Sequence, residues 1–151
     1  MTIKDQKGAA IVEFAIVVPL LLLLVIGICE FGLLWYNSQV IINASREGAR
    51  AGIVLGADFL DDNAVKAIVT AYCDSRVIDF SGNTTVDATN DITLTPNDDR
   101  ASSGFGDDFL VEVEYDYGFL VPALFGLGIT KKITGRTLMK MEQVLGAPPG
   151  P

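Results

Sequence analysis

Residues 8–31 read GAAIVEFAIVVPLLLLLVIGICEF, an almost unbroken apolar stretch close to the N-terminus. About twenty apolar residues are enough for a helix to cross the ~30 Å hydrocarbon core of a bilayer. A helix also satisfies its own backbone hydrogen bonds, which lipid cannot do. The stretch contains one early acid, Glu13, and no further charged residue before Glu30. We therefore predict a membrane-spanning helix over residues 9–36, and its early acid needs an explanation.

The segment differs from a cleavable secretory signal. Such a signal has a shorter apolar core followed by a small-residue cleavage site, whereas here the small residues 8–10 precede the core. We expect the apolar segment to be retained and residues 1–8 to be a removable leader. Lys4 and Lys7 in that leader favour a cytoplasmic N-terminus by the positive-inside bias. Pro19 is expected to kink the helix or to melt one turn locally.

The two acids of the apolar stretch have different expected roles. Glu30 lies near Trp35 and Tyr36, whose rings favour the headgroup level, so its carboxylate is expected to reach the membrane interface. Glu13 either snorkels to the inner surface or is retained for a partner at bilayer depth. If the leader is removed, the new α-amino group on Ala9 is such a partner, one helical turn before Glu13. The pair can form within one helix or between packed subunits.

Two stretches of this sequence resemble a known family. Residues 8–14, GAAIVEF, resemble the processing site of the type IV pilin superfamily. Residues 43–52, NASREGARAG, are similar to the TadE-like minor pilins or pseudopilins of the tight-adherence (Tad) system. The resemblance is strong over residues 8–57 and only general beyond them.

The resemblance implies a processing step and a role for individual residues. A prepilin peptidase would cut between Gly8 and Ala9, which makes Glu13 the fifth mature residue. Glu13 and its neighbour Phe14 would then act in assembly and register. Phe14 stands where Tad-type pilins commonly carry a tyrosine, so no role of a tyrosine hydroxyl is carried over.

Beyond the span, the chain is predicted to continue as an amphipathic helix over residues 37–57, because its apolar positions follow helical spacing. Ala44, Gly48 and Gly52 recur every four residues, and a ladder of small residues lets another backbone approach closely. Each glycine costs a helix about 1 kcal/mol relative to alanine, so close packing is expected to compensate. Gly56 is expected to terminate the helix.

A small α+β domain is predicted over residues 58–145, since a helix signal is followed by strand signals. Its helix is expected to begin at Asp61 or Asp62, which place negative charge at the positive end of the helix dipole. It is expected to end near Asp74. The predicted apolar face of this helix consists of Ala64, Ala67, Ile68, Ala71 and Tyr72.

Three segments alternate between apolar and polar residues as strands of an antiparallel sheet do: residues 92–95, residues 109–117 and, less clearly, residues 131–141. The sheet is expected to pack on the long helix. The apolar stretch 118–128 is too short to span a membrane. It can cover the core, rest on the membrane surface or contact a neighbouring subunit. The tail 146–151 is expected to be disordered.

Composition excludes several chemistries. The chain of 151 residues has no histidine and a net charge of −8. The missing histidine rules out Ser-His-Asp and Cys-His nucleophile systems, and the acidic balance argues against a nucleic-acid partner. The paired aspartates at 61–62, 98–99 and 107–108 match no calcium-loop pattern and are explained by solvated turns. No catalytic residue, cofactor or metal is predicted, and Cys29 and Cys73 are expected to be buried and unpaired.

The resemblance implies a structural and assembly subunit rather than an enzyme. Its implied partners are the prepilin peptidase, other pilin or pseudopilin subunits, the Tad inner-membrane assembly platform and membrane lipid. Its implied location is the bacterial inner membrane, with a cytoplasmic N-terminus, a periplasmic domain and incorporation into an extracellular pilus as a further step. Two alternatives stay open: a major Tad-like pilin, typically much shorter, or a single-span anchored periplasmic binding domain unrelated to pili.

Overall fold

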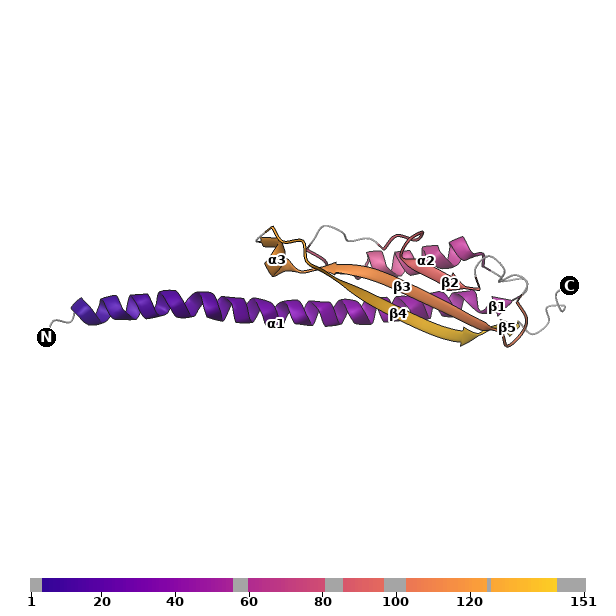
Figure 1. The fold of residues 1–151 in the computed structure, drawn as a ribbon. Helices are drawn as coiled ribbons and strands as arrows, with labels where there is room; N and C mark the ends of the chain where they lie inside the picture. Colours follow the sequence, from indigo (N-terminus) through magenta and orange to yellow (C-terminus); the bar gives the residue numbers. More distant parts are fainter. Residues whose placement is uncertain (1–3, 56–59, 81–85, 97–102, 125, 144–151) are drawn as a thin grey trace.

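The chain folds as one long helix with a small α+β domain built along its C-terminal half (Figure 1). The predicted α+β class is confirmed. The tail 146–151, the expected terminator Gly56 and the aspartate pair 98–99 lie outside the described residues. The computed structural model describes residues 4–55, 60–80, 86–96, 103–124 and 126–143.

Helix α1 spans Lys4–Gly52 and has 49 residues, which corresponds to a length of about 74 Å. It runs through Pro19 without a break, so the locally melted turn is not seen. The helix ends at Gly52, and the prediction that it extends to residue 57 was wrong. The chain continues directly into strand β1, Val54–Leu55.

The early end of α1 has its cause far away in the sequence. Strand β1 pairs in parallel with β5, Glu142–Gln143, and the Glu142 N–H donates to the Ile53 carbonyl oxygen at 2.8 Å. Local periodicity continued to favour a helix at these positions. The tertiary pairing overrides that local preference, as it often does for weak propensities.

Helix α2 spans Asp62–Asp74, and Asp61 is its N-cap, as predicted. The Asp61 carboxylate accepts a hydrogen bond from the Ala64 N–H at 2.8 Å, which satisfies one of the open N–H groups of the first turn. The predicted apolar face was wrong, because Ala67 and Ala71 are exposed. The residues that α2 buries against the rest of the domain are Val65, Val69 and Cys73.

Three strands form an antiparallel sheet in the order β2-β3-β4. They are β2 at Ile92–Thr95, β3 at Asp108–Gly118 and β4 at Thr130–Lys140, within one residue of the predicted bounds. A short helix, α3, spans Leu120–Leu124 and lies between β3 and β4. In the register, Val113 lies opposite Ile92 on one side and Gly135 on the other.

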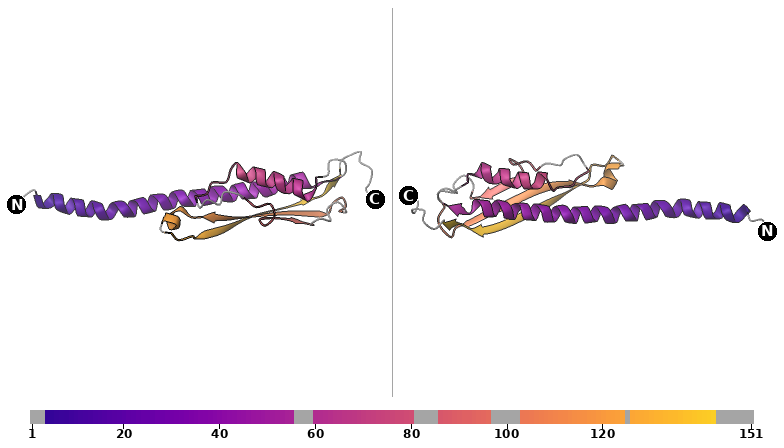
Figure 2. Two further views of the ribbon diagram at one scale, coloured as in Figure 1. Left: turned by 90° about the horizontal axis from the view of Figure 1, so that it is seen from above. Right: turned by 180° about the vertical axis from the view of Figure 1, so that it is seen from behind.

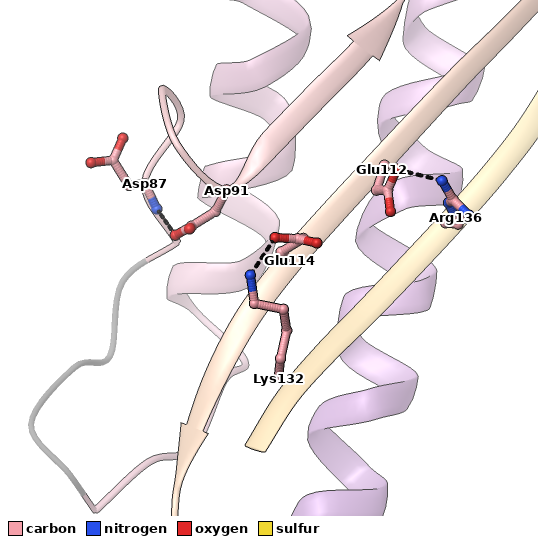
Figure 3. A network of polar contacts seen from close by, with 6 residues as sticks. All are labelled: Asp87, Asp91, Glu112, Glu114, Lys132 and Arg136. Atoms are coloured by element: carbon pink, nitrogen blue, oxygen red, sulfur yellow. Dashed lines mark hydrogen bonds and ion pairs between the residues drawn. The ribbon is translucent and has the colours of Figure 1, made fainter. Parts of the chain in front are cut away.

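The core lies between the inner face of this sheet and the helices α1 and α2, which share one layer (Figure 2). The alternation predicted for β3 is confirmed, since every second side chain from Phe109 to Tyr117 is buried. The outer face carries cross-strand ion pairs (Figure 3). Arg136 Nη2 lies 2.9 Å from Oε2 of Glu112, and Lys132 Nζ lies 2.7 Å from Oε2 of Glu114. Exposed pairs of this kind contribute about 0–1 kcal/mol each.

Candidate membrane-anchoring and assembly site

The N-terminal half of α1 extends beyond the domain (Figure 1). From residue 8 to residue 29 no side chain is buried, although the segment is rich in large apolar residues such as Ile11, Leu20 and Ile28. Among the described residues, α1 is the one helix long and apolar enough to cross a membrane. Because the chain itself does not cover this surface, lipid or neighbouring subunits must remove it from water.

The residues of the predicted processing site all lie on this uncovered segment. The Gly8–Ala9 peptide bond is part of α1, and both residues are exposed. Glu13 follows Ala9 by four residues, so helical geometry places the two on one face. Phe14 is 69% exposed. The structure brings Ala9 and Glu13 within one turn, and the roles of these residues in cleavage and assembly stay predictions.

Glu30 has a partner within its own chain that the sequence did not indicate. Its side chain is only 8% exposed. Its Oε1 accepts hydrogen bonds from the backbone N–H of Leu120 and, at 3.4 Å, from that of Val121. These are the first residues of α3, whose open N–H groups and positive dipole end attract a carboxylate. Glu30 therefore binds α3, in place of the free interfacial position that we expected.

This contact places the apolar stretch 118–128 beside α1. Phe119 packs against the domain core, and its ring meets that of Tyr117 edge-on at a centroid distance of 5.4 Å. Leu127 and Ile129, which follow α3, are more than half exposed. The start of the stretch thus covers the core, while Leu127 near its end and Ile129 just after it present apolar side chains outward.

The predicted small-residue ladder lies inside the domain. Ala44, Gly48 and Gly52 are all buried. A Cβ at Gly48 would lie 2.4 Å from Cγ2 of Val69 and 3.4 Å from Cγ1 of Val111. The close neighbours of Gly48 are therefore α2 and β3 of the same chain. These contacts also explain the buried face of α2, since Val69 fills the space that a side chain at position 48 would occupy.

A second close approach joins β4 to α1 and was missed from the sequence. A Cβ at Gly135 would lie 2.6 Å from the Ile41 carbonyl oxygen and 2.9 Å from the Ile42 nitrogen. Nearby, the Ser45 hydroxyl hydrogen-bonds with Thr137 Oγ1 and with the Ile42 carbonyl oxygen, each at 2.8 Å. A glycine within a strand pattern is a signal for such an approach, but it does not name the partner.

Asn37 fixes a loop of the domain to α1 just beyond the apolar stretch. Its fully buried side-chain amide donates to the Ile78 carbonyl oxygen at 2.6 Å and accepts from the Ile78 N–H at 3.0 Å. The next residue, Asp79, accepts a hydrogen bond from the Tyr115 hydroxyl at 2.6 Å. Burial and this bond to Asp79 raise the pKa of Tyr115 far above its ordinary value. The loop is thereby held at both of these residues.

These features define a class: an α+β protein anchored in a membrane by an N-terminal helix that its own domain leaves half uncovered. The model of the TadE family, described as TadE-like protein, matches residues 8–50. The resemblance to TadE-like proteins is thus confirmed over these residues, which span the uncovered segment and most of the packed part of α1. The matched stretch comprises 43 of the 151 residues. No curated protein and no solved structure matches the chain.

Proposed function

We propose that the chain is a TadE-like minor pilin or pseudopilin, a structural and assembly subunit of a Tad pilus. The uncovered apolar segment of α1, with its acid five residues after Gly8, carries this proposal. Lipid tails and the interior of a helix bundle are both apolar. One surface can therefore serve in the membrane before assembly and against neighbouring helices afterwards.

A prepilin peptidase cuts the chain between Gly8 and Ala9. The cut creates a cationic α-amino group at the first residue of the mature helix, where the dipole is already positive. Glu13 lies one turn further on, so cleavage supplies the partner that its charge needs in apolar surroundings. The N-terminus lies on the cytoplasmic side and the domain in the periplasm, by the charge bias of the leader.

The processing step is tested by intact mass and N-terminal sequencing of the full chain, produced with and without the peptidase. We expect the loss of residues 1–8 and a mature start at Ala9, only when the peptidase is present. Gly8→Leu is the matched variant, expected to insert in the membrane and to stay uncut. A different mature start, or no cleavage at all, would contradict the processing step and favour the anchored binding domain.

The role of Glu13 is tested with Glu13→Gln, which keeps the shape and removes the charge. Hydrogen bonds to charged groups contribute about 1.5–3 kcal/mol, so incorporation into pili should fall about tenfold or more. Membrane insertion and cleavage should be unchanged. Glu30→Gln is the matched control, because the partner of Glu30 is α3 of its own chain. Equal incorporation of Glu13→Gln would support snorkelling instead.

Stoichiometry separates a minor subunit from a major pilin. The described residues between 60 and 143 add a folded domain to the helix, whereas the major Tad-like pilins that the sequence resembles are typically much shorter. Quantitative mass spectrometry of sheared pili should find this chain far below the most abundant subunit. A chain that forms the bulk of the pilus would be the major pilin.

A further inference from the structure

A groove of about 290 Å³ lies between α1 and the first residues of β4. This volume is near the lower end of the ~300–1,000 Å³ typical of small-molecule sites. One wall is mainly apolar and aromatic, and the other carries two lysines. The wall from α1 consists of Phe31, Leu34, Trp35 and Ser38, and the wall from β4 consists of Lys131, Lys132, Ile133 and Thr134.

The groove lies at the height where α1 leaves the hydrocarbon core. The uncharged segment ends at Cys29, and Glu30 is the next residue. Trp35 follows Glu30 by five residues, which is about 8 Å along a helix. The headgroup layer on each side of a bilayer is about 5–8 Å thick. Trp35, which is 64% exposed, therefore lies at the headgroup level, where tryptophan rings are favoured.

The end of the domain around this groove is apolar at its surface. Phe80, Leu127 and Ile129 are each more than half exposed. Phe80 follows the loop that Asn37 holds on α1, and the other two follow α3, which lies at the end of the domain nearest the uncovered part of α1 (Figure 1). These three exposed apolar side chains thus come from two segments that both contact α1 close to the uncovered part of the helix.

The two lysines of the groove differ in whether a carboxylate of the same chain already pairs with their charge. Lys132 Nζ lies 2.7 Å from a carboxylate oxygen of Glu114 on the outer face of the sheet (Figure 3). Lys131 shares its strand face with Ile133, the face that packs on α1, because side chains alternate along a strand. No ion pair of Lys131 is found among the residues that the structure describes. In a chain of net charge −8, this cation at headgroup level favours an anion.

We propose that the groove binds the headgroup of an anionic phospholipid, with its phosphate at Lys131 and its glycerol backbone and first acyl carbons beside Phe31, one helical turn on the membrane side of Trp35. A lysine near an anionic lipid surface contributes about 1 kcal/mol. Such a site would fix the depth and rotation of α1 in the membrane. The proposal depends on the membrane span alone and holds whether or not the chain enters a pilus.

Trp35 is the one tryptophan of the sequence, and it reports on its own lipid neighbours. The full chain is reconstituted in nanodiscs of phosphatidylcholine and phosphatidylglycerol at fixed ratio, with bromine atoms on the acyl chains of one lipid at a time. Quenching of Trp35 then measures how often each lipid occupies the groove. We expect brominated phosphatidylglycerol to be enriched about fivefold over its bulk fraction, as ~1 kcal/mol implies.

Three variants separate a groove from a general charge effect. Lys131→Gln should remove most of the enrichment, and Lys131→Gln with Lys132→Gln should reduce it to one, the value for no preference. Lys140→Gln is the control, because Lys140 carries the same charge at the far end of β4, where it pairs with Asp108. It should leave the enrichment unchanged. Thermal unfolding of each variant establishes that the domain remains folded.

Three results would overturn the proposal. The first is equal quenching by the two brominated lipids in the unaltered chain, and the second is an enrichment that survives Lys131→Gln with Lys132→Gln. The third is a Trp35 that neither lipid quenches, which would mean that protein, such as a neighbouring helix, occupies the groove. Each of these results leaves the cleavage and pilus tests unaffected, so failure of the lipid site is distinguishable from failure of the proposed function.

Discussion

The two halves of α1 belong to one continuous helix and have opposite surroundings. Residues 8–29 carry large apolar side chains on all sides, and none of them is buried by the chain. Residues 37–52 pack one face against the domain, and several of the buried side chains on that face are small, such as Ala44, Ser45 and Ala49. Large side chains suit a fluid apolar solvent, whereas small ones allow a fixed neighbour to approach closely. The first half of α1 is therefore suited to contact lipid or neighbouring subunits, and the second half is suited to pack within the chain's own domain.

The same difference determines what each half requires of its sequence. An uncovered segment in lipid tolerates exchange among large apolar residues, because no fixed neighbour constrains their shape. The packed half meets backbone and stiff valine side chains at van der Waals distance, so added volume has no place to go. Substitutions in or against the packed half should therefore unfold the domain and leave membrane insertion intact.

The largest effect is expected for Gly135→Ala. The new methyl group would lie 2.6 Å from the Ile41 carbonyl oxygen, and helix backbone cannot move aside as a flexible side chain can. Overpacking usually costs 1–3 kcal/mol, and here we expect about 3 kcal/mol or more. Chemical unfolding of the full chain in detergent measures the loss, while membrane insertion should be unaffected.

Gly128→Ala is the control for this prediction. Gly128 lies close before β4, and an added Cβ there would meet nothing within 4 Å. A change in unfolding free energy within about 1 kcal/mol is expected, in either direction, from altered chain entropy. If both alanine variants unfolded alike, the close approach of β4 to α1 would not be a determinant of stability.

A smaller effect should separate two buried tyrosines of β3. Tyr115→Phe removes the hydroxyl that donates to Asp79, and loss of a bond to a charged group should cost about 1.5–3 kcal/mol. The Tyr117 hydroxyl is buried without a hydrogen-bond partner among the described residues, so Tyr117→Phe should be neutral or stabilising. Unfolding curves of the two variants test this contrast, and equal losses would show that the Tyr117 hydroxyl has a partner in solution.

One cysteine lies in each of the two regions: Cys29 on the uncovered segment of α1 and Cys73 in the packed domain. Both are free, but Cys29 is exposed on the uncovered half, so the expectation of two buried thiols was wrong for it. Burial, together with the charge of Asp74, raises the pKa of Cys73 to about 11 from 9.0. At pH 8 its thiolate fraction is then roughly 100-fold below that of an unshifted thiol. Maleimide in detergent should label Cys29 first, and Cys73 only upon unfolding. Fast labelling of native Cys73 would contradict its burial.

The smallest effect is a pH dependence that belongs to the packed domain. Because folding raises the pKa of Cys73, the folded state binds the proton more tightly than the unfolded state. The thiol's contribution to stability is fully present below pH 9 and is lost as the pH rises towards about 11. Thermal unfolding of the unaltered chain should therefore weaken more over this range than that of Cys73→Ala. Parallel pH profiles would exclude this contribution.

The local signals of the sequence were sufficient for the span, the strands and the bounds of α2. Each rests on neighbouring residues: an uncharged apolar stretch, alternation along β3, and Asp61 at the start of a helix. The face of α2 was wrong because it is determined by the missing side chain at Gly48 on another helix. No pattern within α2 records which of its faces meets that space.

Local sequence signals predicted a helix long and apolar enough to cross a membrane, an acid five residues after Gly8, and an α+β domain after the helix. These features depend on composition and short-range period. Tertiary packing, in contrast, sets where the domain begins to cover α1, brings Glu30 to the start of α3 and places Gly135 against the backbone of α1. The last two contacts join residues ninety or more positions apart, and their proximity exists only once the chain has packed.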